Sequence, residues 1–338
     1  MLLNSSISCT GDTFVLSAQI GAVQDQVSSF SVCVDAVLPL FLVMAVGFIA
    51  RRAGAISPED VPKANKWAFK FFMPIMLFYN IYTSDLSAAV QPKIIIFAVV
   101  CVLVLYGLSF GFVMLTEKQD DKRGVMIQGL YRSNFVIMGI PLAAQLVEGA
   151  DLGPVVILVA VVIPIFNVLA VITLEMFNGT KPSVGKMLLD VLKNPLIIGI
   201  ATGIVVQLVG LKLPTAVESA ANMIGKAGSP LMLFLLGAFF EIKGVGTHKK
   251  QLATVCIGRL VIVPAIFLTL SVLCGVRGVE LAAMIAIFGS PTAISSFTMT
   301  QQMGGDSALA GDIVVFTSGL SCVTMFAWAL ALKSMGMF

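Results

Sequence analysis

The chain has 338 residues, of which 58% are hydrophobic and only 12% charged, with a formal net charge of +3. A soluble domain has about 25% charged residues, so we expect no soluble fold, and the small net charge gives no reason to expect a nucleic-acid partner. The single histidine, His248, and six scattered cysteines argue against a histidine-based triad, a metal site and a disulfide framework. We therefore predict no catalytic residues and no cofactor.

Residues 1–33 differ from the rest of the chain. They lack the basic start and compact apolar block of a signal peptide. Leu16, Ile20, Val23 and Val27 recur at helical spacing with polar residues between them, which predicts an amphipathic helix lying on the outer membrane surface. A weakly ordered leader is the alternative.

Ten long apolar runs follow, separated by short charged stretches. A run of about 20 apolar residues spans a bilayer as a helix, because every backbone N–H and C=O must be bonded internally in lipid. The sequence therefore predicts an all-α integral membrane protein with ten transmembrane helices. The runs are 34–50, 68–84, 94–115, 124–147, 153–176, 187–210, 214–240, 251–274, 279–302 and 308–332.

The orientation of these runs follows from their basic residues, which are retained in cytoplasmic loops. If the N-terminus lies outside, most lysines and arginines between the runs are cytoplasmic, among them Arg51, Lys122 and Lys250. An even number of spans then places the C-terminus outside as well. We expect a multi-pass protein of the plasma or inner membrane with both termini extracytoplasmic.

The chain also matches itself when it is shifted by 156 residues. Prolines and glycines coincide without a gap, which chance apolar similarity would rarely produce. Since each half then holds five spans, an odd number, the second half must be inverted, as in many secondary transporters. We predict repeats at 34–176 and 187–335, joined by a cytoplasmic linker at 177–186. The matched pairs are Pro39 with Pro195, Gly47 with Gly203, Gly54 with Gly210, Pro58 with Pro214 and Pro74 with Pro230.

The fourth span of each half has a polar centre interrupted by glycine and proline. Proline removes a backbone donor and breaks the helix, and a half-helix N-terminus offers free N–H groups to an anion. Paired interruptions of this kind indicate a transporter's binding site, although ordinary kinks are the alternative. An offset of 150 or of 155 residues could relate the two centres. The candidate substrate-binding residues are Arg132, Ser133, Asn134, Gly139 and Pro141, and Gly289, Ser290, Pro291, Thr292 and Ser295.

Isolated charges inside the spans are further candidates. Arg132 and Arg259 lie deep in their runs, where a charge is costly and functional by default; each could attract an anion, pair with an acid or reach the inner surface. Asp306 and Asp312 stand near the start of the last span, where acids favour a helix N-terminus. Asp312 could instead take part in proton coupling.

Three stretches resemble the auxin efflux carrier family, in particular its bacterial branch of malate permeases. They are Arg132 to Pro141 (RSNFVIMGIP), Asn194 to Gly199 (NPLIIG) and Gly304 to Asp306 (GGD), and the similarity covers about residues 34–335. The resemblance implies a fold similar to bile acid–sodium symporters, with broken helices four and nine crossing at the site. It also implies a scaffold of spans one, two, six and seven beside a mobile, elevator-like transport domain.

The family's substrates are carboxylates, auxin in plants and malate-like acids in bacteria. Residues 1–33 have no counterpart in it, and the long loop of plant carriers is replaced by a short stretch around residues 180–186, which favours the bacterial branch. We therefore expect a secondary active transporter for small organic anions. Its partners would be that anion and the lipid bilayer. Either the membrane potential or a coupled proton would set the direction of transport, and a homodimer is left open. A sodium-coupled symporter and a non-transporting membrane sensor are the alternatives, whereas an intramembrane enzyme would need motifs that the sequence lacks.

Overall fold

The computed structural model describes residues 31, 34–35, 37–84, 92–147, 152–177, 184–241 and 244–338. The amphipathic helix expected before residue 31 and most of the linker expected at 177–186 lie outside these residues. Within the described part of the chain all regular structure is helical, and the one β-bridge joins two isolated residues. The predicted all-α membrane class is therefore confirmed.

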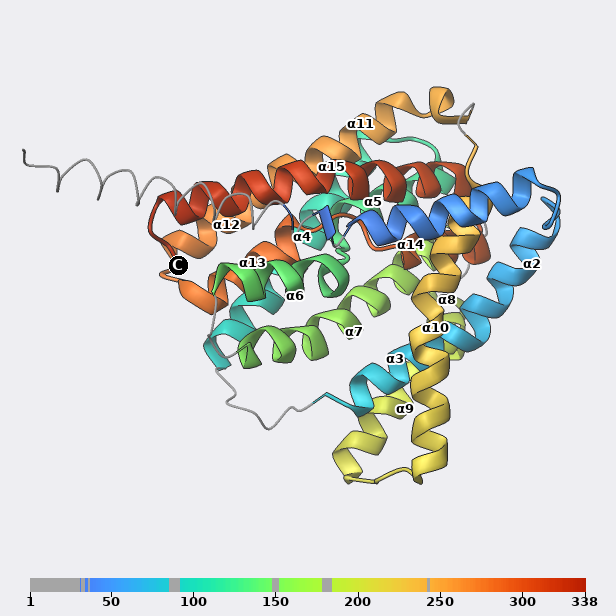
Figure 1. Ribbon diagram of the computed structural model, residues 1–338, viewed down its shortest axis with the longest axis horizontal. Helices are drawn as coiled ribbons and strands as arrows, with labels where there is room; N and C mark the ends of the chain where they lie inside the picture. Colours follow the sequence, from blue (N-terminus) through green and yellow to red (C-terminus); the bar gives the residue numbers. More distant parts are fainter. Residues whose placement is uncertain are drawn as a thin grey trace, which may run out of the picture.

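Each apolar run predicted from the sequence coincides with one or more helices (Figure 1). Two π-helical turns each join two helices into one continuous stretch. Ala68–Phe72 joins α2 to α3, and Gly258–Ile262 joins α11 to α12. The helices are a first one over residues 37–52, α2 (Asp60–Trp67), α3 (Met73–Tyr82), α4 (Pro92–Thr116), α5 (Asp120–Tyr131), α6 (Phe135–Leu146), α7 (Gly153–Met176), α8 (Val184–Lys193), α9 (Pro195–Val209), α10 (Thr215–Phe239), α11 (Lys249–Ile257), α12 (Val263–Leu273), α13 (Gly278–Gly289), α14 (Ser295–Met303) and α15 (Ser307–Ser334).

The outer surface of this bundle is apolar. Leu115, Leu208 and Leu273 are each more than three-quarters exposed, which water would penalise but lipid tails would not. Among the described residues, five helical stretches are long and apolar enough to cross a membrane: α4, α7, α10, the continuous stretch Lys249–Leu273, and α15. The molecule is a multi-pass membrane protein.

The helices fall into two groups. In the first, α3 packs against α9 and α10, and the three lie together at the lower end of Figure 1. The helix over residues 37–52 joins this group through Gly47 and Gly237, where an added Cβ would collide with the backbone of the opposite helix. Small residues allow such close packing of membrane helices.

The second group surrounds α13. This helix packs against α6, α7, α12 and α15, which lie above α3 and α9 in Figure 1. Its side chains from Leu281 to Phe288 are all buried. A helix that is apolar and buried on every side needs neighbours all round, so α13 forms the centre of this group.

Two of the predicted spans begin or end elsewhere. The span expected at 68–84 starts earlier, at Asp60, because α2 runs through the π-helical turn into α3. The span expected at 187–210 is interrupted at Asn194, whose side chain caps α9 by accepting a hydrogen bond from Leu196 N at 3.0 Å. Pro195 occupies the first position of α9, where its missing N–H costs nothing, and so separates α8 from α9.

Candidate functional site

The two polar centres found in the sequence are unwound segments that cross each other. One, residues 132–134, separates α5 from α6, and the other, residues 290–294, separates α13 from α14. Ser133 and Thr292 form an antiparallel bridge at the crossing. Asn134 N donates to Pro291 O at 2.8 Å, and Ala293 N donates to Arg132 O at 3.3 Å. Each break therefore supplies hydrogen-bond partners for the other.

These bonds also define the register between the two centres. A twofold axis through the bridge would exchange Ser133 with Thr292 and each of the two hydrogen bonds with the other. Residues related by this axis are therefore 159 positions apart in the sequence. This register differs from the expected 150 and 155. The offset of 150 aligned Gly139 and Pro141 with Gly289 and Pro291, and the offset of 155 aligned acidic residues beyond them. Gly139 and Pro141 lie inside α6, however, whereas Pro291 lies in the second break. The expectation that Gly139 and Pro141 interrupt the helix is therefore wrong.

Arg259 holds the two half-helices together at their C-terminal ends. It comes from the π-helical turn before α12, and its guanidinium is fully buried. It donates to Ser290 O and Ile287 O at 2.8 Å each, and to Leu130 O and Tyr131 O at 3.2 and 3.3 Å. The carbonyls that end a helix carry partial negative charge and lack partners within it. One cation thus satisfies the ends of both α5 and α13.

Thr292 links the crossing to α5 and α15 by hydrogen bonds. Its hydroxyl donates to Gly129 O at 2.8 Å, and its backbone N donates to Thr317 Oγ1 of α15 at 3.2 Å. Gly289, Ser290 and Pro291 are likewise buried beside it. None of these four predicted site residues lines the cavity described next.

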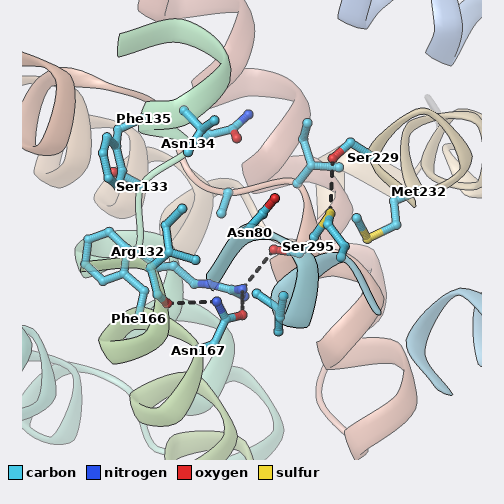
Figure 2. Close-up of a pocket in the computed structure, with 16 residues that line it drawn as sticks. Asn80, Arg132, Ser133, Asn134, Phe135, Phe166, Asn167, Ser229, Met232 and Ser295 are labelled. Carbon is cyan, nitrogen blue, oxygen red and sulfur yellow. Dashed lines mark hydrogen bonds between the residues drawn. The ribbon is translucent and has the colours of Figure 1, made fainter. Parts of the chain in front are cut away.

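A cavity of about 110 Å³ lies beside the crossing, between the two groups of helices. Figure 2 shows its polar side chains converging from different helices. The second group also includes α5 and α14, which both pack against α7 and α15, and it contributes Arg132, Ser133, Asn134, Asn167 and Ser295. The first group contributes Asn80, Ser229 and two methionines. Four of the residues predicted from sequence, Arg132, Ser133, Asn134 and Ser295, are therefore brought together. The lining residues are Met76, Leu77, Asn80, Arg132, Ser133, Asn134, Phe135, Val136, Ile163, Phe166, Asn167, Ser229, Met232, Ala293, Ile294 and Ser295.

The guanidinium of Arg132 supplies positive charge to the wall of this cavity. Nη2 donates to Asn167 Oδ1 at 2.6 Å and to Ser295 Oγ at 2.8 Å (Figure 2). Nη1 donates to Gln128 Oε1 at 3.2 Å, with Ser296 Oγ at 3.4 Å. All these partners are neutral, and among the described residues no carboxylate forms an ion pair with Arg132. Its charge is oriented but not neutralised.

Two further side chains of the first break have unused hydrogen-bonding groups. Ser133 Oγ and Asn134 Nδ2 are buried and have no hydrogen-bond partner within the described part of the chain. Asn134 also stands at the N-cap of α6 without capping it, and an uncapped helix N-terminus offers N–H donors to an anion. A buried donor without a partner costs about 1–3 kcal/mol. The wall of the cavity therefore presents unpaired donors beside a positive charge.

Sequence reasoning missed three polar residues of the cavity. Asn167 was visible as a polar residue in an otherwise apolar run, but Asn80 and Ser229 belong to no motif. Their role depends on packing between helices far apart in the sequence. Among the described residues, no group of three or more His, Cys, Asp or Glu side chains could hold a metal ion.

Comparison with known proteins gives a consistent result. Residues 32–329 match the family model described as membrane transport protein. An uncharacterized transporter of Methanocaldococcus jannaschii is 22% identical over 305 residues, covering 87% of this chain and 97% of its own length. Auxin efflux carrier component 8 of Arabidopsis thaliana is 30% identical over 120 residues, or 33% of this chain and 32% of its own. The mouse lysosomal cholesterol signaling protein is 23% identical over 260 residues, or 71% of this chain and 29% of its own.

Proposed function

Because the chain belongs to the membrane transport protein family, which includes the auxin efflux carriers, we propose that it is a secondary active carrier for a small organic anion. The substrate is a compact carboxylate of the malate type. It binds in the cavity beside the crossing and is carried by alternating access. The protein lies in the plasma or inner membrane.

The proposal rests on one observation. The cavity has hydrogen-bond donors without acceptors and a positive charge that no carboxylate of the described residues neutralises. Asn134 Nδ2 and Ser133 Oγ have no partner, and Arg132 has only neutral ones. A carboxylate placed there would accept hydrogen bonds from the side chains and from the N-terminus of α6. Hydrogen bonds that involve a charged group contribute about 1.5–3 kcal/mol each, enough for selective binding of a small anion.

The architecture that we propose has ten spans in two inverted repeats, residues 34–176 and 187–335, as in bile acid–sodium symporters. In this scheme α5 with α6 is span four, and α13 with α14 is span nine. Two contacts support it. Gly47 packs against Phe234 O, and Gly203 packs against Phe78 O. The offset of 156 residues relates both members of the first contact to those of the second, as an inverted repeat requires.

The position of the cavity supports movement of one helix group against the other. Met76, Asn80, Ser229 and Met232 come from the first group, which we propose is the scaffold. Arg132 and its neighbours come from the second, which would carry the anion. Since the anion's main donors all belong to the second group, that group could slide past the scaffold without releasing it.

A membrane sensor built on the same fold is the second candidate. The similarity to the mouse lysosomal cholesterol signaling protein over 71% of this chain favours it. A sensor needs a ligand site but no net movement of the ligand across the membrane. The two functions therefore differ in flux and not in binding.

Exchange of radiolabelled malate in proteoliposomes tests the proposal. We expect the wild-type protein to exchange it and Asn134→Leu, which keeps the side-chain size but removes the donor, to lose exchange. Thr298→Val is the matched control, because Thr298 Oγ1 is also buried and unpaired but does not line the cavity. A panel of mono-, di- and tricarboxylates would define the substrate. Binding without exchange of any carboxylate would refute the carrier and favour the sensor.

A further inference from the structure

A second cavity lies away from the crossing and holds a buried acid that the proposed anion site does not use. Its volume is about 300 Å³. One wall comes from the first group of helices and the segment before α2, and includes Arg51, Phe239 and Glu241. The other wall is the start of α15, with Ala308, Gly311 and Asp312. The cavity therefore lies on the same boundary between helix groups as the anion site.

Asp312 is a buried acid of this cavity, and one of its oxygens has no hydrogen-bond partner among the described residues. Its side chain belongs to a residue only 4% exposed, and Oδ2 accepts no hydrogen bond from any described residue. A buried carboxylate that is neither paired nor hydrogen-bonded is strongly unfavourable in its charged form. Binding a cation at Oδ2 would remove this cost.

The two arginines nearby are already engaged. Arg51 donates to Ala238 O and Phe239 O and forms an ion pair with Glu241 at 2.6 Å. Arg259, on the turn that packs against α15, is held by four carbonyls of the crossing. Neither guanidinium is available to neutralise Asp312.

Two titratable groups face Asp312 from the start of α15 and from the segment before α11. His248 Nε2 lies 3.5 Å from Asp306 Oδ2. Asp306 is used as the cap of α15, accepting from Leu309 N at 2.9 Å. A metal ion would need more ligands than the described residues offer here, whereas a proton needs only one oxygen.

One helix connects Asp312 to the anion site. Thr317 lies five residues further along α15, about 7.5 Å at 1.5 Å per residue, and its hydroxyl accepts the hydrogen bond from Thr292 N at the crossing. A change at Asp312 that shifts α15 would therefore also shift the unwound segment that pairs with Ser133. The two cavities are mechanically linked through a rigid element.

We propose that Asp312 is a proton-binding site that couples proton movement to anion transport, an inference that rests on the proposed carrier function. A proton from the adjoining water binds Oδ2 and converts the carboxylate to a neutral carboxylic acid. This removes a negative charge from the boundary where α15 must pass the Arg51–Glu241 pair. The second group of helices then moves with both the proton and the anion, and releases both on the other side.

Infrared difference spectroscopy on the purified protein in nanodiscs tests the site without any substrate. Between about pH 5 and about pH 8, a range in which ordinary carboxyl groups are mostly ionised, the wild type should show the carbonyl band of a protonated carboxyl group. Asp312→Asn should lose this band, and Asp306→Asn should keep it. Asp312→Glu retains a carboxyl group and should show the band of a protonated carboxyl. This variant keeps the test valid if Asp312→Asn disturbs folding. An unchanged band in Asp312→Asn, or a band that added sodium abolishes at constant pH, would overturn the proton assignment.

A transport measurement separates this inference from the proposed function. Proteoliposomes with malate as the probe and a pH-sensitive dye in the lumen should show proton movement with malate, at a potential clamped by potassium and valinomycin. Asp312→Asn should lose proton movement with malate and also the pH dependence of malate exchange. If it moves protons as the wild type does, coupling through Asp312 is refuted. If the wild type moves no carboxylate, both the carrier function and the coupling are refuted. The infrared band then still decides whether Asp312 binds a proton.

Discussion

Replacing Arg259 by methionine should destabilise the protein strongly. The substitution keeps a long apolar side chain but leaves four carbonyls, those of Leu130, Tyr131, Ile287 and Ser290, without their donor. The ends of α5 and α13 would then lose the charge that satisfies both of them.

The magnitude follows from the geometry. The two bonds of 2.8 Å contribute about 1.5–3 kcal/mol each, and the two longer ones contribute less. Burying the guanidinium offsets part of this gain. We therefore expect Arg259→Met to lower the unfolding free energy by about 3–5 kcal/mol, which is the sum of the two short bonds less the cost of burying the guanidinium.

Arg51 offers a matched control. It also donates to carbonyls at the end of a helix, those of Ala238 and Phe239 in α10, but its side chain is 23% exposed and its partner Glu241 is 65% exposed. Because water screens such a pair, Arg51→Met should cost at most about 1 kcal/mol. Equilibrium unfolding in mixed micelles, followed by circular dichroism, measures both. Equal losses in the two variants, or a loss below about 1 kcal/mol for Arg259→Met, would refute the clamp.

Three further predictions follow from the topology, the site and the loops. A reporter fused after Phe338 should be extracytoplasmic, and a cytoplasmic signal would contradict the inverted repeat. Malate exchange should persist when sodium is replaced by choline at a fixed potential, because Arg132 already provides the positive charge; a strict sodium requirement would favour the sodium-coupled alternative. Glu117 lies in the loop after α4. Burial alone would raise its pKa, but hydrogen bonds from Gln119, Gln251 and Lys118 lower the pKa below its ordinary 4.5. The ionised form therefore stabilises the fold fully above that value and less as pH falls below it. Thermal unfolding against pH should show a weaker acid-side decline in Glu117→Gln, and an unchanged decline would contradict this account.

The helices were largely predictable because lipid imposes a simple rule. Long apolar runs must be helical, and the runs 94–115, 153–176 and 214–240 match α4, α7 and α10 within a few residues. Interruptions were harder to place. Pro195 separates α8 from α9 because the preceding Asn194 caps the new helix, whereas Pro141 lies inside α6. Proline indicates a break only where the freed backbone groups find other partners.

The candidate site was predictable in position but not in the roles of its residues. The polar letters around Asn134 and Ser295 marked the crossing, since polar groups inside a span need a reason. Arg132 and Arg259 looked alike in the sequence, at similar depth in their runs. Only their partners distinguish them: side chains of the cavity for Arg132, and helix-end carbonyls for Arg259. Those partners come from distant helices, which a single sequence does not align.

The central claim is that a carboxylate binds beside Asn134 at the crossing. It is tested most directly by the increase in melting temperature that malate, or another carboxylate exchanged by the wild type, produces in the purified protein. We expect the midpoint concentration to rise about tenfold to a hundredfold in Asn134→Leu, the equivalent of one lost hydrogen bond to a charged group. It should stay unchanged in Thr298→Val. An Asn134→Leu protein that is stabilised at the same concentrations as the wild type would contradict the account.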